Sequence, residues 1–263
     1  MSAATAPAAE APTTPAPGEV IVSVRGLTMG WGDRVLMRAL DFDIKRGEVF
    51  VILGGSGCGK STLQRHLIGL AEPMAGTILV EGQPPELRAD EAPRYGVMFQ
   101  SGALLGSKTV GQNVALPLES WTSLPPDAID AVVRAKLGLV GLDGFENHLP
   151  AEISGGMKKR AAIARALALD PSLLFLDEPS AGLDPVSAAQ LDDLIILLGR
   201  GLGVTTVVVT HELASIFAIG TNCIMLDRDS KGIIARGDPR ALRDGSTDPR
   251  VRAFFHREGG GAR

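Results

Sequence analysis

The sequence has few of the residues on which several protein classes depend. Among its 263 residues there are two cysteines, Cys58 and Cys223, too few for a disulfide framework or a cysteine metal cluster. Aromatic residues make up 4% of the chain and the net charge is -4, so it offers neither stacking platforms nor excess positive charge for nucleic acid. We therefore expect reduced thiols, a cytoplasmic protein and no nucleic-acid partner.

Long hydrophobic runs are also missing. The longest apolar stretches fall well short of the roughly 20 residues needed to span a bilayer. The first basic residue is Arg25 and no apolar segment precedes it, so we expect no signal peptide and any membrane association to come through a partner. Residues 1–18 hold 7 Ala and 4 Pro, a composition that predicts a disordered tail before a single folded domain at 19–263.

What the chain does contain is an alternation of strand and helix patterns. Residues 48–53 form a continuous apolar run that ends at a glycine-rich loop, as a buried parallel strand does. The pattern predicts an α/β fold with a mostly parallel sheet, interrupted by a helical insertion at about residues 101–167. Leu63, Leu67 and Leu70 are expected on one helical face, and Asp127 is expected to cap a later helix. Strands are predicted near residues 20–24, 40–44, 76–82, 95–100, 173–177, 204–210, 222–227 and 232–237.

The glycine-rich loop matches the phosphate-binding pattern G-x-x-x-x-G-K-[ST] in full, between a predicted strand and a predicted helix. Its glycines let the backbone curl so that N–H groups point inward, and the helix N-terminus favours anions. Lys60 is expected to reach the β and γ phosphates, and Ser61, with Thr62 beside it, to reach Mg²⁺. The alternative is a glycine-rich turn that happens to contain Lys-Ser. The predicted nucleotide-binding residues here are Gly54, Gly55, Ser56, Gly57, Cys58, Gly59, Lys60, Ser61 and Thr62.

Two carboxylates, Asp177 and Glu178, end the apolar strand "LLFLD". An Asp at the end of a core strand can hold Mg²⁺, and we assign Asp177 that role. Glu178 is then placed to act as the general base for an attacking water. Standing alone, such a pair would more simply cap the next turn.

A second anion-binding pattern lies 94 positions after Lys60, where Ser154, Gly155 and Gly156 precede a basic helix. In order, these motifs resemble those of ABC-transporter ATPase subunits, over about residues 20–255. The resemblance implies a P-loop NTPase (RecA-like) core, an antiparallel β subdomain and an inserted α-helical subdomain. It also implies that two chains pack head to tail, so that Ser154 and the two glycines cap the ATP held by the partner's Lys60.

The same resemblance implies roles for four further residues. Trp31 matches an aromatic that stacks on adenine, where the family more often has Tyr. Gln100 matches a glutamine that meets Mg²⁺ and the lytic water and begins the segment facing the membrane subunit. Asp184 matches a loop that communicates across the dimer, and His211 a histidine that contacts the γ-phosphate.

Met157 stands where most members of the family have Gln. The run "ISGGMKKRAAIARALALDP", the stretch after Gln100 and the ending "DPRVRAFFHRE" are similar to the ATPases of Mce-type lipid transporters, including the maintenance-of-lipid-asymmetry (Mla) group. That similarity implies ATP hydrolysis with Mg²⁺ on the cytoplasmic face of the inner membrane, a permease subunit and an Mce-domain partner. Met157 taken alone would be an adaptable packing residue.

Three alternatives stay open at this stage. The chain could serve another ABC importer or exporter, act as a soluble ABC ATPase on ribosomes or nucleic acid, or be a small-molecule kinase. A single phosphate loop and a negative net charge disfavour the second, and Ser154-Gly155-Gly156 has no use in the third. The residues do not identify the lipid, the direction of transport, the accessory subunits or a C-terminal clasp to the partner.

Overall fold

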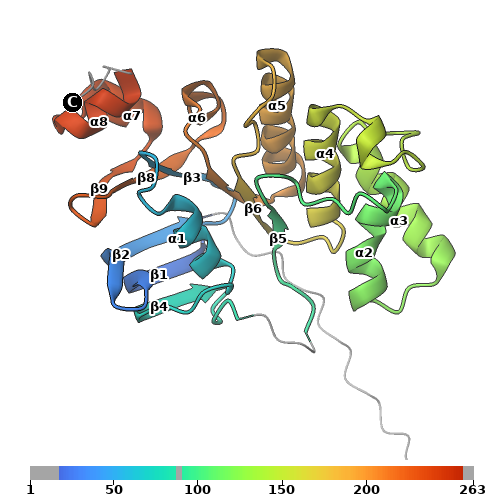
Figure 1. Cartoon of the computed structure of the whole chain (residues 1–263), viewed down its shortest axis with the longest axis horizontal. Helices are drawn as coiled ribbons and strands as arrows, with labels where there is room; N and C mark the ends of the chain where they lie inside the picture. Colours follow the sequence, from blue (N-terminus) through green and yellow to red (C-terminus); the bar gives the residue numbers. More distant parts are fainter. Residues whose placement is uncertain (1–17, 87–90, 257–263) are drawn as a thin grey trace, which may run out of the picture.

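The computed structural model describes residues 18–86 and 91–256, so the predicted tail lies outside the described residues except for Gly18. Strands and helices alternate along the chain, as the sequence pattern predicts (Figure 1). The strands are β1 (Val20–Trp31), β2 (Arg34–Lys45), β3 (Val49–Gly54), β4 (Ala75–Val80), β5 (Gly96–Met98), β6 (Leu173–Asp177), β7 (Thr205–Val209), β8 (Asn222–Asp227) and β9 (Gly232–Gly237). The helices are α1 (Lys60–Leu67), α2 (Val110–Trp121), α3 (Pro126–Leu139), the 3-10 turn η1 (Pro150–Glu152), α4 (Gly155–Ala166), α5 (Pro185–Leu202), α6 (Leu213–Ile219), α7 (Pro239–Gly245) and α8 (Pro249–His256).

The central sheet has the order β5-β6-β7-β3-β8-β9. All neighbours pair in parallel except β9, which runs antiparallel to β8. The mostly parallel sheet expected from the sequence is therefore confirmed. Because parallel strands present their carboxyl ends at one edge, the segments that follow β3, β5, β6 and β7 meet there.

The antiparallel sheet β2-β1-β4 and helix α1 cover one face of the central sheet. Alternate residues of the parallel strands point into this layer; Phe50 and Ile52 of β3 are among them. The rings of Phe42 and Phe50 stack across the two sheets at a centroid distance of 5.7 Å. The expected antiparallel β subdomain is thus present, held by apolar burial.

The intervening residues of the same strands face the helices on the other side. Val49 and Val208 pack in the cluster formed by α2, α4 and α5, whereas Val51 and Leu53 pack against α6 and α8. Helices α2, α3 and α4 all lie between β5 and β6 in the chain and stand beside the sheet in Figure 1. None of the helices in the described part of the chain is long and apolar enough to cross a membrane.

The prediction that Leu70 shares a helical face with Leu63 and Leu67 is wrong. Helix α1 stops at Leu67, and Leu70 lies beyond it with 52% of its surface exposed. Gly69 has φ 67°, and the N–H groups of Gly69 and Leu70 donate to His66 O and Arg65 O. This is the Schellman arrangement that ends a helix at glycine.

Asp127 is not the N-cap of its helix, because Pro125 holds that position and Asp127 lies in the first turn. Pro126 occupies the first helical position, where its missing N–H costs nothing. Helices α2 and α7 were not predicted individually. The signal for α2 was available in a capping box, in which Thr109 Oγ1 accepts from Gln112 N–H and the Gln112 side chain accepts from Thr109 N–H.

Asn113 of α2 fixes the segment that precedes its own helix. The side chain is fully buried, and its Oδ1 accepts the N–H of Leu105 at 2.7 Å. Its Nδ2 donates to the carbonyl oxygens of Leu105, Lys108 and Thr109 at 2.9–3.1 Å. One amide group therefore holds the loop between Gln100 and α2 in place.

We expect Asn113→Ala to lower the free energy of unfolding by about 2–4 kcal/mol, because the N–H of Leu105 and the carbonyl of Lys108 lose their partner. Urea unfolding followed by circular dichroism measures the change. The neighbouring Gln112→Ala, which removes only half of the capping box, should cost about 1 kcal/mol. An equal loss in both variants would show that Asn113 does not anchor the loop.

Candidate functional site

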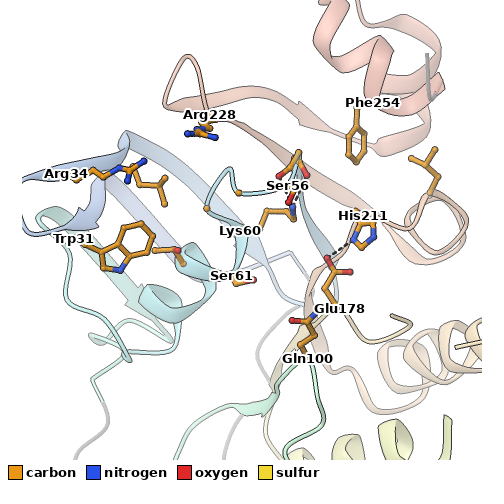
Figure 2. A pocket seen from close by; sticks show the side chains of 17 residues that line it. Trp31, Arg34, Ser56, Lys60, Ser61, Gln100, Glu178, His211, Arg228 and Phe254 are labelled. Carbon is orange, nitrogen blue, oxygen red and sulfur yellow. Dashed lines mark hydrogen bonds and ion pairs between the residues drawn. The ribbon is translucent and has the colours of Figure 1, made fainter. Parts of the chain in front are cut away.

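A cavity of about 870 Å³ opens at the carboxyl edge of the parallel sheet (Figure 2). The phosphate-binding loop after β3 forms its floor, Trp31 lies toward one end, and Gln100, Glu178 and His211 lie toward the other. The lining residues are Trp31, Arg34, Leu36, Gly54, Gly55, Ser56, Gly57, Gly59, Lys60, Ser61, Thr62, Gln100, Glu178, His211, Leu213, Arg228 and Phe254. Most of the residues predicted from separate motifs are thus brought to one place.

Backbone constraints explain the glycines of the loop. Gly54 has φ 144°, and a Cβ there would lie 2.5 Å from Leu226 O of β8, so a larger residue would force the strands apart. Gly59 caps α1 in the left-handed region and has no side chain to accept from the first-turn N–H groups. Lys60 Nζ donates to the carbonyl oxygens of Gly54 and Gly55 at 2.8 and 3.1 Å. Uncapped N–H groups and a lysine at the start of a helix form a site suited to phosphate.

Ser61 and Asp177 meet beside this loop. Ser61 Oγ donates to Asp177 Oδ1 at 3.4 Å, although the two residues come from α1 and the end of β6. Burial raises the pKa of Asp177, and the neighbouring Glu178 carboxylate adds to that rise. Among residues 18–86 and 91–256 no group of three His, Cys, Asp or Glu side chains could hold a metal. The pair fits Mg²⁺, which commonly takes one or two protein oxygens and completes its shell with phosphate and water.

Glu178 combines backbone strain, burial and one carboxylate oxygen without a hydrogen-bond partner in the described structure. Its φ is 47°, in the left-handed region that a non-glycine residue adopts at a cost, and its N–H donates to Val209 O at 2.8 Å. The residue is 8% exposed. His211 Nδ1–H donates to Glu178 Oε1 at 2.8 Å, whereas Oε2 is buried without a hydrogen-bond partner in the described structure. One oxygen is thus held by His211, and the other is buried without a partner of its own among the described residues.

His211 was expected to meet the γ-phosphate. In the structure it lines the cavity and also contacts Glu178, a pairing that the sequence did not indicate. Gln100 lines the same cavity from the end of β5.

Trp31 stands at the tip of the β1–β2 hairpin with 56% of its surface exposed. Gly32 and Asp33 form the two-residue turn, so Arg34 is the direct cross-strand partner of Trp31. Directly opposed residues project from the same face of a hairpin, and both side chains line the cavity. An exposed indole at a cavity mouth offers a stacking surface for a base.

Five predicted nucleotide-binding residues do not line this cavity. Cys58 is buried in the core, where burial raises the pKa of its thiol. Ser154 instead caps α4 by accepting from Met157 N–H, and Gly155 and Gly156 begin the same helix. Asp184 caps α5 by accepting from the N–H groups of Val186 and Ser187. The Ser187 hydroxyl also donates to Asp184 Oδ2, and this bond, followed by the N–H bonds, lowers the pKa of the Asp184 carboxyl.

The first turns of α4 and α5 lie against each other. A Cβ on Gly155 would lie 3.6 Å from Leu183 Cδ2, and one on Gly156 3.5 Å from Ser187 Cβ. The Ser-Gly-Gly segment and the segment of Asp184 therefore form one surface, separate from the cavity of their own chain.

Five lining residues were not predicted: Arg34, Leu36, Leu213, Arg228 and Phe254. The Gly-Asp turn after Trp31 was a usable signal for Arg34, since a two-residue hairpin places it opposite the indole. Arg228 and Phe254 come from the β8–β9 turn and α8, and their approach depends on tertiary packing alone.

Comparisons with known proteins identify the family of the chain. A family model described as ABC transporter matches residues 37–181. The chain is 42% identical over 245 residues to the "Probable ribonucleotide transport ATP-binding protein mkl" of Mycobacterium leprae, covering 91% of the chain and 70% of that relative. It is 39% identical over 240 residues to the "Intermembrane phospholipid transport system ATP-binding protein MlaF" of Escherichia coli (strain K12), covering 89% and 88%.

Two solved structures share the fold. CbiO1 from Clostridium perfringens, part of the ABC transporter complex cbiONQ, aligns with a TM-score of 0.77 at 30% identity over 86% of this chain and 92% of that one. The dimeric ATP-binding cassette MJ0796, in a post-hydrolysis state bound to ADP and Pi, aligns with a TM-score of 0.72 at 28% identity over 82% and 98%. With its phosphate loop, acidic strand end and Ser-Gly-Gly helix in place, the chain belongs to the ABC transporter family as an ATP-binding, ATP-hydrolysing subunit.

Proposed function

We propose that this subunit powers a membrane permease that moves phospholipid or another hydrophobic molecule with an Mce-domain partner. It would act as a dimer on the cytoplasmic face of the inner membrane, with ATP and Mg²⁺. The observation that carries the dimer is the position of Ser154, which begins a helix suited to an anion yet lies outside the cavity of its own chain. A second copy supplies the missing contact.

Residues that line the cavity, together with Asp177 beside it, carry out different parts of hydrolysis. Lys60, now bonded to the loop carbonyls, turns toward the β and γ phosphates, while Ser61 and Asp177 hold Mg²⁺. Bound Mg²⁺ supplies neutralisation of phosphate charge. Glu178, which lines the cavity, takes the proton of the attacking water, and His211 keeps the carboxylate in place through Oε1.

A mainly apolar groove of about 330 Å³ is the surface that we assign to the permease. It runs between the segment around β5 and helix α2, and it includes the exposed side chains of Leu70, Phe99 and Trp121. Phe99 immediately precedes Gln100, so a partner seated here touches the segment that enters the nucleotide cavity. Exposed apolar side chains gathered around a groove are typical of protein–protein contacts.

The names of the relatives differ on cargo. The mkl relatives are named for ribonucleotide transport, and the MlaF relatives for phospholipid transport. We favour a hydrophobic cargo because this chain matches MlaF of Haemophilus influenzae over 92% of both chains at 39% identity, whereas it spans 70% of the M. leprae relative. Met157 and the basic residues after it support the same choice.

Affinity purification of the tagged subunit from detergent-solubilised membranes tests the permease contact. The wild-type subunit should co-purify with an integral-membrane permease. Leu70→Asp should co-purify with at least about tenfold less permease, because docking would bury the new charge in the groove. Leu202→Asp is the matched control, since Leu202 is 54% exposed on α5 and does not line the groove. Both variants should melt at the wild-type temperature, and equal permease yield from both would contradict this docking surface.

The purified complex then tests the cargo. In phospholipid vesicles it should move labelled phospholipid only when ATP is present, and it should not accumulate a labelled ribonucleotide. Transport of the ribonucleotide alone would favour the other relative's cargo. Recovery of ribosomes or nucleic acid in place of a permease would remove the transport function.

A further inference from the structure

The basic run Lys158-Lys159-Arg160 contains one buried cation. Lys159 is 8% exposed, whereas its two neighbours are only half-buried. Arg160 binds Gln190 Oε1 and Val140 O near the outer surface of α4. Among the described residues, Lys159 makes no ion pair with a carboxylate. Its buried ammonium is therefore stabilised by hydrogen bonds to neutral groups.

Those hydrogen bonds go to the main chain at two places in the site. Lys159 Nζ donates to the carbonyl of Gln100 and, at 3.2 Å, to the carbonyl of Glu178. Burial lowers the pKa of Lys159, and the nearby carboxylates of Asp177 and Glu178 oppose that change. A buried ammonium is costly, so its retention here requires a compensating use.

The carbonyl of Glu178 belongs to a residue whose backbone is already strained. Its φ of 47° is held on the other side by its N–H bond to Val209 O. Lys159 therefore binds the peptide group whose position sets the orientation of the Glu178 carboxylate. Lys159 also donates to the carbonyl of Gln100, so one ammonium connects the segments that follow β5 and β6.

Lys159 lies about one turn from the first residue of α4, which Ser154 caps. Near the other end of α4, Arg165 donates to the carbonyls of Gly102 and Ala103 at 2.8 and 2.7 Å. The helix is thus fastened to the segment after Gln100 by two cations, but only Lys159 also reaches Glu178.

We propose that Lys159 is a positioning residue that ties the helix capping the partner's nucleotide to the main chain of Gln100 and Glu178 in its own site. When Ser154 meets the nucleotide across the dimer, movement of α4 carries Lys159 with it and sets the aim of both side chains. This inference rests on the proposed roles of Ser154, Gln100 and Glu178.

Steady-state ATP hydrolysis by the full-length protein tests the inference. Lys159→Met keeps the length of the side chain but removes the donors and the charge. Its kcat should fall about 10- to 100-fold, as misplacement of a catalytic group does. The KM for ATP should change less than about twofold, because no contact with the nucleotide is removed. Lys159→Arg, which keeps charge and donors, should recover much of the lost kcat.

Two further variants separate positioning from general stability. Lys158→Met, on the same helix with no side-chain partner in the described structure, should keep wild-type kcat. Arg165→Met, which loosens residues 102 and 103 but not Glu178, should lose less kcat than Lys159→Met. If Lys159→Met fails to fold, Lys159→Gln, which keeps one donor group, takes its place with the same expected direction.

Wild-type kcat in Lys159→Met, or a loss that follows the melting temperature and is not recovered by arginine, would overturn the proposal. Glu178→Gln measured alongside distinguishes the causes. If it is inactive while Lys159→Met is normal, only the role of Lys159 fails. If Glu178→Gln is itself active, the assignment of the base fails first.

Discussion

Glu178→Gln should lower the rate of ATP hydrolysis by about 10²- to 10⁴-fold while ATP binding is retained, because general-base catalysis is removed and the phosphate site is not. The amide oxygen of glutamine can still accept the His211 Nδ1–H bond that now ends on Oε1. What disappears is the basicity of the carboxylate, on which the proposed role of Glu178 depends. Phosphate release measures turnover, and size-exclusion chromatography with ATP should show a dimer that persists.

Glu212→Gln is the matched control. Glu212 follows His211, lies 3.6 Å from its Nε2 and does not line the cavity. The Glu212→Gln protein should hydrolyse ATP at the wild-type rate. A Glu178→Gln protein that turns over normally would remove Glu178 from the role of base, and one that no longer binds ATP would place it in binding.

Mixing two inactive variants should restore hydrolysis. Lys60→Ala removes the lysine proposed to bind phosphate in a chain's own cavity, and Ser154→Arg blocks the cap that we propose it offers to a partner. Each homodimer carries a lesion in both sites. In a dimer of one chain of each kind, both lesions fall in the same composite site and the other site is intact. An equal mixture that exchanges freely forms about half mixed dimers, so activity should reach at most about a quarter of wild type.

The recovery depends on Ser154 acting on the partner's nucleotide. If Ser154 served the cavity of its own chain, each site of the mixed dimer would carry one lesion, and the mixture would stay inactive. Mass spectrometry of the mixture must show that mixed dimers form. The rate of ATP hydrolysis by each variant alone gives the baseline.

The parts of the site that were predictable depend on local chemistry. Glycines at Gly54 and Gly59 are required by backbone conformation, and a strand ending in Asp177 and Glu178 must deliver both carboxylates to the edge where the phosphate loop lies. The mostly parallel direction of the strands followed from the alternation of apolar runs with helical patterns, whereas their order in the sheet did not. Such features survive in the sequence because each depends on a few consecutive residues.

The missed parts depend on contacts between distant segments. The hydrogen bond from His211 to Glu178 and the grip of Lys159 on two carbonyls have no local pattern, because each joins different elements. Leu70 was misplaced for the opposite reason. The helical spacing was real, but Gly69 ends the helix, and a Cβ there would lie 2.2 Å from Pro85 O.

The position of β3 in the middle of the sheet has a consequence for biosynthesis. Val49 pairs with Thr206 and Phe50 with Asn222, so the strand that leads into the phosphate loop waits for neighbours encoded far downstream. At about 5–20 residues per second, roughly 8–30 s separate the emergence of β3 from that of β7, the first of its two neighbours to be made. Throughout that interval the apolar strand has no sheet to join, and closure of such long-range pairings is slow. The nascent chain therefore carries an unpaired apolar strand, with the risk of aggregation that this brings, until most of it has been translated.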